Sequence, residues 1–468
     1  MTTPSPDPGS FRDPMSRVFV SDDAVIRSLS GDALADYEAA ASATFFTKAL
    51  ADGRIVGTER VPDDQVAALV GAEGHWEAAL RHDRIPFLSY PYEWTFEMLR
   101  DAALLQLQLT RHGIDEDVIT KDATSYNVQF VGATPTFIDV GSFEKLRAGE
   151  PWYGYRQFCE LFLYPLMFQA YKNLPFQPWL RGAIDGITPS EARDVMSFRD
   201  RFRKGVFTNV YLQAAFENRY SDTEADVKKD LGKAGFKKEL IAANLDKLTK
   251  LVTRLKWKQS ESTWSGYSER GHYTDADLDA KSDFVEKVVN LRARSLVWDL
   301  GANDGHFSRL AAKSADYVVA VDADPLVVDT LYRALREEAN TSILPLTMDL
   351  SSPSPGLGWR GHERKAFTDR STPDLVLCLA VIHHLAITNN VPLPEFVAFL
   401  ADVGAEAVVE FPTPEDQMVK RLLRNKREGT HDDYTATVLE RALKDHFDIV
   451  EQQTLPSGTR VLYHITPR

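Results

Sequence analysis

The sequence predicts an α/β protein whose C-terminal part is a doubly wound, mostly parallel seven-stranded sheet, preceded by an α+β region and a helical connector. Seven apolar runs follow one another with helical stretches between most of them: SLVWDLG, YVVAVDA, SILPLTMDL, DLVLCLAV, EAVVEFP, FDIVEQQ and TRVLYHIT. Strands that are apolar on both faces are typical of a parallel sheet covered by helices on each side. The last two runs are close enough together to form an antiparallel hairpin.

Composition restricts the classes of protein and of partner. The chain has 468 residues and is 44% hydrophobic, so it can bury a large core spread over more than one domain. Its formal charge of −14 disfavours a broad phosphate-binding surface, so nucleic acid is not an expected partner. Cys159 and Cys378 each lie in an apolar run, which indicates buried free thiols in a reducing cytosol, with no metal site.

No segment predicts a membrane span or a cleaved leader. The N-terminal stretch MTTPSPDPGSFRDP lacks a basic segment followed by an apolar one. The most apolar run, FCELFLYPLMF, is interrupted by Glu160 and Pro165 and is shorter than a bilayer requires. We therefore expect a cytoplasmic protein with no membrane partner.

Changes in composition divide the chain into four segments. Residues 1–16 are rich in Pro, Ser and Asp and are expected to form a disordered tail. Residues 17–195 are expected to form an aromatic-rich α+β domain. Residues 196–272 are expected to form a helical connector and lid, because apolar residues recur there at helical spacing before a polar stretch. Residues 273–468 then form the sheet domain.

The stretch VWDLGANDGHFSRL, residues 297–310, is an apolar strand, a loop with two glycines and an amphipathic helix. Glycine lets the chain turn tightly and lets a ligand touch the main chain. In open α/β sheets, ligands bind beyond the carboxyl ends of the strands, where the first strand-to-helix turn offers unpaired amides. The predicted cofactor-binding residues in this stretch are Asp299, Gly301, Asn303 and Gly305.

Two further acids indicate which cofactor the loop binds. Asp322 ends the second strand, 17 residues after Gly305, where a carboxylate can accept hydrogen bonds from both ribose hydroxyls. Asp349 ends the third strand, where an acid can accept the adenine amino group. A pyrophosphate is disfavoured, because Asp304 adds negative charge to the loop. A cofactor with a ribose, an adenine and a cationic centre suits these acids, and S-adenosylmethionine has all three.

Residues 296–468 resemble the class I S-adenosylmethionine-dependent methyltransferases. The glycine loop, Asp322, Asp349 and DLVLCLAVIHHL occur in that family's order and approximate spacing. Asn303 departs from the commonest glycine-rich loop, although GANDG is a variant seen in the family. RIPFLSYPYEWTFEMLRDAALLQL and KDATSYNVQF resemble a bacterial set related to rhizobial nodulation-type methyltransferases. The resemblance implies methyl transfer to an acceptor that the sequence does not identify.

Candidate catalytic residues follow the fourth and fifth strands. His383 and His384 lie where this fold points groups at the transferable methyl, and histidine titrates near neutrality. Glu410, in VVEFPTPED, is a second candidate base. Each of the three can instead be structural, through packing or a backbone hydrogen bond. Tyr273 and Lys281 precede the first strand, and either lie on the surface or close over the cofactor.

The N-terminal region raises a separate hypothesis. In KDATSYNVQFVGATPTFIDVGS, Asp122, Asn127 and Asp139 resemble the catalytic and metal-binding positions of kinase-like folds, where the acids and the amide position the hydroxyl and Mg²⁺. Arg27 stands where a kinase uses lysine, and Glu38 would lie on the next helix. No glycine-rich phosphate loop precedes them, and Thr120 replaces the usual histidine. We expect an abbreviated kinase-like lobe with weak or absent phosphotransferase activity, and the alternative is a hairpin whose acids cap turns.

The sequence is compatible with three functions. The chain can be a methyltransferase whose N-terminal domain recognises a small-molecule acceptor, a bifunctional methyltransferase and phosphotransferase, or a non-catalytic scaffold. The helical segment between residues 228 and 258 is locally basic, which fits either a solvated helix face or contact with an anionic partner. The aromatic cluster fits either a substrate groove or ordinary core, and it comprises Tyr90, Tyr92, Trp94 and Phe96.

Overall fold

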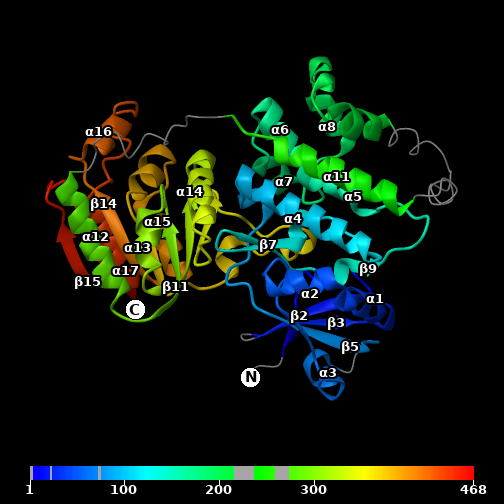
Figure 1. Ribbon diagram of the computed structural model, residues 1–468. Helices are drawn as coiled ribbons and strands as arrows, with labels where there is room; N and C mark the ends of the chain where they lie inside the picture. Colours follow the sequence, from blue (N-terminus) through cyan, green and yellow to red (C-terminus); the bar gives the residue numbers. More distant parts are fainter. Residues whose placement is uncertain (1–3, 22–23, 72–74, 216–236, 259–273) are drawn as a thin grey trace. The chain divides into compact units, whose positions relative to one another are not determined.

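In the computed structural model, the chain folds into two compact units (Figure 1). The residues that it describes are 4–21, 24–71, 75–215, 237–258 and 274–468. Unit 1 comprises residues 1–130, 135–258 and 357–364. Unit 2 comprises residues 131–134, 259–356 and 365–468. No helix among the described residues is both long enough and apolar enough to cross a membrane.

Unit 1 begins with an antiparallel sheet in the order β1-β2-β3-β5-β4. The strands are β1 (Ser5–Pro6), β2 (Ser16–Val20), β3 (Val25–Leu29), β4 (Thr58–Arg60) and β5 (Ala78–His82). Helices α1 (Gly31–Ser42), α2 (Thr44–Ala51) and α3 (Asp63–Val70) lie between them in sequence. Phe19, Ile26 and Val66 form part of the core of this region. Because β1 pairs with β2, regular structure begins inside the segment that was expected to be a disordered tail.

The rest of unit 1 is mainly helical. Helix α4 (Phe96–Asp115) begins at Thr95, whose hydroxyl accepts a hydrogen bond from the Met98 amide. The other helices are α5 (Gly154–Phe158), α6 (Tyr164–Lys172), α7 (Gln177–Gly182), α8 (Pro189–Val195) and α11 (Lys238–Arg254). Two short sheets pair β6 (Val118–Thr120) with β9 (Phe143–Lys145) and β7 (Val128–Val131) with β8 (Thr134–Phe137). Short 3₁₀ turns are η1 (Pro91–Glu93), η2 (Ser125–Asn127), η3 (Val140–Ser142) and η8 (Trp359–Gly361).

The most apolar run of the sequence is core helix. Its middle forms a π-helical turn, η4 (Cys159–Leu163), between α5 and α6. Pro165 lies directly after this turn and has no amide to donate, which accounts for a local departure from α-helical bonding. Cys159 and Phe162 are buried, and Cys159 is a free thiol, as predicted.

Each unit includes a short segment from outside its main stretch of sequence. In unit 1, the Arg12 guanidinium donates to both carboxylate oxygens of Glu363, at 2.7 and 3.0 Å. In unit 2, the Gly132 amide donates to the hydroxyl of Tyr317 at 2.8 Å. The sequence did not predict that residues 357–364 belong to unit 1 or that residues 131–134 belong to unit 2.

Unit 2 contains the predicted seven-stranded sheet, in the order β12-β11-β10-β13-β14-β16-β15. The strands are β10 (Arg294–Leu300), β11 (Ala315–Asp322), β12 (Ile343–Thr347), β13 (Leu375–Cys378), β14 (Glu406–Pro412), β15 (Phe447–Thr454) and β16 (Arg460–Pro467). The first five are parallel to one another, and β16 is antiparallel to both β14 and β15. The mostly parallel sheet and the terminal hairpin are therefore confirmed.

The helices of unit 2 lie alongside this sheet, as Figure 1 shows. They are α12 (Asp275–Val289), α13 (His306–Ala311), α14 (Pro325–Glu337), α15 (Leu393–Val403), α16 (Gln417–Leu423) and α17 (Ala436–His446). A 3₁₀ turn, η9 (Phe367–Asp369), and a π-helical turn, η10 (His384–Thr388), complete the unit. Thr274 caps α12 by accepting a hydrogen bond from the Asp277 amide at 3.1 Å.

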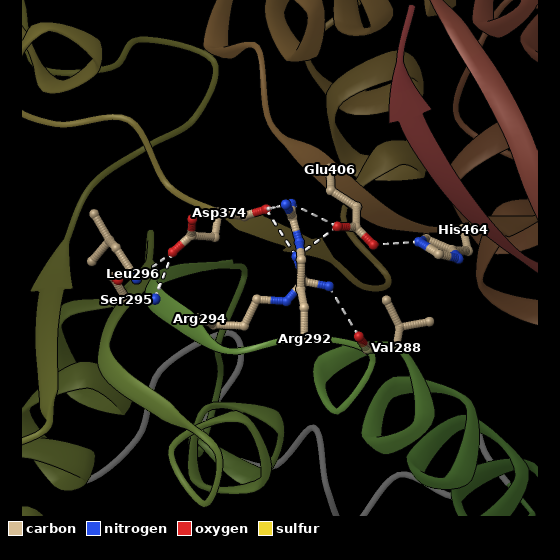
Figure 2. Close-up of polar contacts among 8 residues, drawn as sticks. All are labelled: Val288, Arg292, Arg294, Ser295, Leu296, Asp374, Glu406 and His464. Atoms are coloured by element: carbon tan, nitrogen blue, oxygen red, sulfur yellow. Dashed lines mark hydrogen bonds and ion pairs between the residues drawn. The ribbon is translucent and has the colours of Figure 1, made fainter.

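A buried ion-pair network joins the strands at the amino edge of the parallel sheet (Figure 2). Glu406, at the start of β14, accepts hydrogen bonds from Arg294 of β10 at 2.6 Å and from Arg292 at 2.9 Å. Its other oxygen lies 2.6 Å from Nε2 of His464 on β16. Arg294 also donates to the carbonyl of Val288 at the end of α12. One carboxylate therefore links the first strand, the fifth strand and the antiparallel strand.

Replacing Glu406 with Gln should lower the free energy of unfolding of unit 2 by about 3 kcal/mol, because Arg294 would stay buried without its counter-charge. Glu451→Gln is the matched control, since Glu451 pairs with Lys287 near the surface, and it should cost at most about 1 kcal/mol. Urea unfolding monitored by tryptophan fluorescence measures both. Equal losses in the two variants would contradict the buried network.

The contribution of Glu406 should also depend on pH. Burial raises the pKa of Glu406, but hydrogen bonds from Arg294 and His464 outweigh burial and hold the pKa below its ordinary value. The stabilisation is therefore present above the unfolded-state pKa of about 4.3, and it is lost as pH falls through the folded-state pKa.

Candidate functional site

The loop after β10 has a left-handed backbone conformation at three positions, which few residue types other than glycine adopt. Gly301, Asn303 and Gly305 have φ angles of 91°, 47° and 81°. A Cβ atom on Gly301 would stand 2.1 Å from Cγ2 of Val381, so this position excludes any side chain. Asn303 is among the few other residue types that adopt the left-handed conformation readily, which explains its place in the loop.

Asp322 lies against this loop. Its Oδ2 accepts a hydrogen bond from the Asn303 amide at 3.0 Å, and its Oδ1 accepts one from the Asp324 amide at 2.9 Å. The fold therefore brings the second-strand acid and the glycine loop together, as the spacing predicted. Asp349 is exposed, and its carboxylate accepts hydrogen bonds from the amide and the hydroxyl of Ser351.

Asp299 is enclosed behind the loop. It is 1% exposed and accepts a hydrogen bond from the Ser308 hydroxyl at 2.5 Å. Burial raises the pKa of Asp299 to about 6, and the nearby charges of Asp322 and Asp304 act in the same direction. The Ser308 hydrogen bond and the charge of Lys281 act in the opposite direction and lower the pKa of Asp299, so the loop has carboxylates beside it and Lys281 partly offsets their repulsion.

Glu410 lies at the end of β14 between two cations. Its oxygens lie 2.6 Å from Nζ of Lys281 and 2.9 Å from Nη1 of Arg460, and all three side chains are at most 4% exposed. Burial alone would raise the pKa of Glu410, but the two cations hold it at about 2. Glu410 is thus a permanent carboxylate near neutral pH and a poor proton acceptor.

This network includes residues that the sequence did not single out. Nε of Arg460 donates to Asp416 at 2.8 Å, and Asp416 also caps α16. Lys281 lies over the ring of Phe307, 4.6 Å from its centroid. Of the two residues considered for closing over the cofactor, Lys281 is buried and Tyr273 lies outside the described residues.

The two histidines occupy different environments. His383 is fully buried, and neither ring nitrogen has a hydrogen-bond partner among the described residues. His384 is partly exposed, and the two ring centroids lie 4.1 Å apart. Burial lowers the pKa of both imidazoles, and the charge of Arg460 lowers it further, to about 4 for His384. Both rings are therefore neutral at neutral pH.

An open cavity is lined in part by η10, the turn that begins at His384. Its volume is about 210 Å³, and it includes Ala386 of η10 and Tyr434, whose hydroxyl donates to the carbonyl of Pro412 at the end of β14. The other lining residues are Asn390, Val391, Pro392, Leu393, Thr430, His431 and Asp433. The lining contains one carboxylate and no lysine or arginine, so it suits a neutral or cationic group better than an anionic one.

Two of the kinase-like residues of unit 1 are paired with each other, and the Asn127 side-chain nitrogen is buried without a hydrogen-bond partner among the described residues. Arg27 on β3 forms an ion pair with Asp139 at 2.8 Å. Burial raises the pKa of Asp122, and the charge of Asp139 adds to this. Glu38 pairs with Arg60 instead of Arg27. In the described part of the chain, no three acidic, histidine or cysteine side chains are grouped to hold a metal ion.

The aromatic cluster of unit 1 is core. Tyr90, Tyr92, Trp94 and Phe96 are at most 6% exposed, and the Trp94 ring packs edge-on against Phe130 with centroids 5.0 Å apart. The indole nitrogen of Trp94 donates to the Ser89 hydroxyl. Of the two interpretations of this cluster, burial favours core over a substrate groove.

Comparison with solved structures finds partial similarity. The N-methyltransferase NodS from Bradyrhizobium japonicum WM9, in complex with S-adenosyl-l-homocysteine, is 12% identical and covers 44% of this chain and 99% of its own, with a TM-score of 0.32. Magnesium protoporphyrin IX methyltransferase from Synechocystis PCC 6803, with bound SAH, is 20% identical and covers 43% and 94%, with a TM-score of 0.31. These scores are too low to assign an activity.

Comparison with known sequences is more informative. No family model matches the chain. Nodulation protein NoeA of Rhizobium meliloti (strain 1021) is 34% identical over 461 residues, which cover 97% of this chain and 94% of that protein. The alignment therefore spans both units. At this identity and coverage, the chain belongs to the family of nodulation protein NoeA.

Proposed function

We propose that unit 2 binds S-adenosylmethionine and transfers its methyl group to a small acceptor. The observation that carries the proposal is the hydrogen bond between Asp322 and the Asn303 amide, which joins a ribose-binding acid to a left-handed glycine loop. Asp299, Asp304 and Asp322 supply the negative surroundings that a sulfonium favours and a pyrophosphate does not. The alternative of a non-catalytic scaffold gives no reason for these three acids to occur together.

The residues have separable roles in the proposed reaction. Asp322 accepts hydrogen bonds from the ribose, and Asp349 would turn from Ser351 to accept the adenine amino group. When bound, the cofactor supplies an electrophilic methyl group for an in-line displacement, so positioning and exclusion of water provide much of the acceleration. Glu410, with Lys281 and Arg460, keeps the carboxyl edge of the sheet rigid and excludes water beneath the site.

His384 is the residue placed to contact the acceptor. It begins η10, which contributes Ala386 to the open cavity, and it is neutral and partly exposed. A neutral imidazole can accept a hydrogen bond from an acceptor hydroxyl or amine. The fully buried His383 supports the ring of His384 from behind and is not itself exposed to an acceptor.

Asp322→Ala should weaken the binding of S-adenosylmethionine by about 1.5–3 kcal/mol, the usual range for hydrogen bonds to a charged group. Asp316→Asn is the control, because Asp316 is an exposed acid at the start of β11, the strand that ends at Asp322. Isothermal titration calorimetry of the full chain measures both. A folded wild type that releases no heat at high protein concentration would refute the proposal.

Unit 1 is proposed to contribute acceptor recognition. The relative aligns over both units, so the N-terminal part accompanies the sheet domain in both proteins. The alternative, a bifunctional enzyme with phosphotransferase activity, is disfavoured because Arg27 already neutralises Asp139, the acid that would have to hold Mg²⁺.

Titration of the full chain with Mg²⁺ and ATP should therefore give no saturable binding and no phosphate release. Calorimetry and a phosphate-release assay measure these two quantities. The bifunctional alternative predicts the opposite: saturable binding that is lost in Asp139→Asn and retained in Asp185→Asn, an exposed acid of the same unit.

A further inference from the structure

Four exposed apolar side chains of the described residues lie within a short stretch of unit 1 that follows α8 in sequence. Phe198 and Phe202 are 68% and 79% exposed, and Phe207 is 50% exposed. They belong to a 3₁₀ turn, η5 (Phe198–Phe202), and a π-helical turn, η6 (Phe207–Tyr211). Leu212 follows at 38%. We call residues 198–212 the aromatic–basic surface.

Cations are interleaved with these rings. Residues 198–212 contain Arg199, Arg201, Arg203 and Lys204 against the single acid Asp200, a net charge of +3 in a chain whose net charge is −14. The Arg201 guanidinium lies over the ring of Phe198 at 4.7 Å and over that of Tyr211 at 4.9 Å. The side chains of the two turns therefore form one continuous surface.

Helix α11 extends the positive charge beside this surface. Leu251 packs at Gly205, where an added Cβ would stand 2.4 Å from its side chain. Lys247 and Arg254 are exposed and lie on the side of α11 next to Leu251, because they are four residues before and three residues after it. The basic helical segment noted in the sequence thus borders the exposed phenylalanines.

We propose that the aromatic–basic surface docks unit 1 on an anionic lipid membrane. Cations beside large apolar side chains are the combination that binds such an interface: the cations attract the anionic headgroups, and the rings enter the acyl boundary. This peripheral contact reverses the expectation that no membrane is involved, and it requires no spanning helix. It does not depend on the proposed methyl transfer.

Two other partners fit the surface less well. A nucleic acid would stack its bases on aromatic faces, but the Arg201 guanidinium already covers faces of Phe198 and Tyr211. A second copy meeting the same surface across a twofold axis would bring like charges together. The charge favours an anionic surface, and the exposed Phe and Leu side chains favour one with an apolar interior.

Sedimentation of the full chain with vesicles tests the proposal. The protein should bind vesicles of mixed phosphatidylcholine and phosphatidylglycerol, bind pure phosphatidylcholine far less, and be released by salt. The double variant Phe198→Ser/Phe202→Ser should lose binding, whereas Trp359→Ser, which removes an aromatic side chain 66% exposed outside the surface, should retain it. Circular dichroism confirms that each variant is folded, since all three side chains are exposed.

A second double variant, which removes two cations of the aromatic–basic surface, completes the experiment. Arg199→Gln/Lys204→Gln should weaken binding about tenfold or more, since each cation near an anionic surface contributes about fivefold. The exposed pair Lys420→Gln/Lys444→Gln in unit 2 is the control for net charge. No binding to the anionic vesicles, or equal binding by the phenylalanine variant, would overturn the proposal. Phe198-dependent binding to RNA, or self-association through this surface, without vesicle binding would also overturn it.

Discussion

Glu410 lies between the cations of Lys281 and Arg460, and the carboxyl edge of the sheet in unit 2 depends on this contact. Lys281 comes from α12, Glu410 from β14 and Arg460 from β16, so one carboxylate joins elements far apart in sequence. Arg460 also contacts Asp416, which caps α16. Removing one member of a buried ion pair leaves an uncompensated charge, so none of these positions is free to change alone.

The same network determines the chemistry available nearby. Burial lowers the pKa of His383 and keeps the imidazole neutral, and the positive charges of Arg460 and Lys281 act in the same direction. Asp299, Asp304 and Asp322 place carboxylates at the glycine loop, and the charge of Lys281 acts on Asp299 as well. The carboxyl edge therefore combines carboxylates that suit the proposed cationic cofactor with the neutral imidazole of His384, which can accept a hydrogen bond from the proposed acceptor.

The sheet and its loop could be predicted because their sequence signals are local. Apolar runs bounded by polar turns predict strands, and the left-handed positions at Gly301, Asn303 and Gly305 lie in five consecutive residues. The burial and pairing of Lys281 also had a local signal in the sequence. It falls on the apolar face of α12, three and four residues before Phe284 and Val285, where a lysine is expected to be buried and paired.

Several features could not be predicted, because they depend on partners distant in sequence. Nothing near Glu363 indicates that it pairs with Arg12, and nothing near Gly132 indicates a bond to Tyr317. The first residues look like a disordered tail by composition, yet Ser5 and Pro6 pair with Phe19 and Val20. Composition reports the cost of ordering a segment, and only the fold supplies the contacts that offset it.

The most direct test of the central claim, methyl transfer by unit 2, uses S-adenosylmethionine carrying a heavy-isotope methyl group. The full chain is incubated with an extract of Rhizobium meliloti, the organism of its relative, and mass spectrometry follows the demethylated cofactor and any labelled product. We predict stoichiometric formation of both by the wild type, and turnover reduced about a hundredfold by His384→Ala with cofactor affinity nearly unchanged. A protein that binds the cofactor but yields no labelled product would contradict the account.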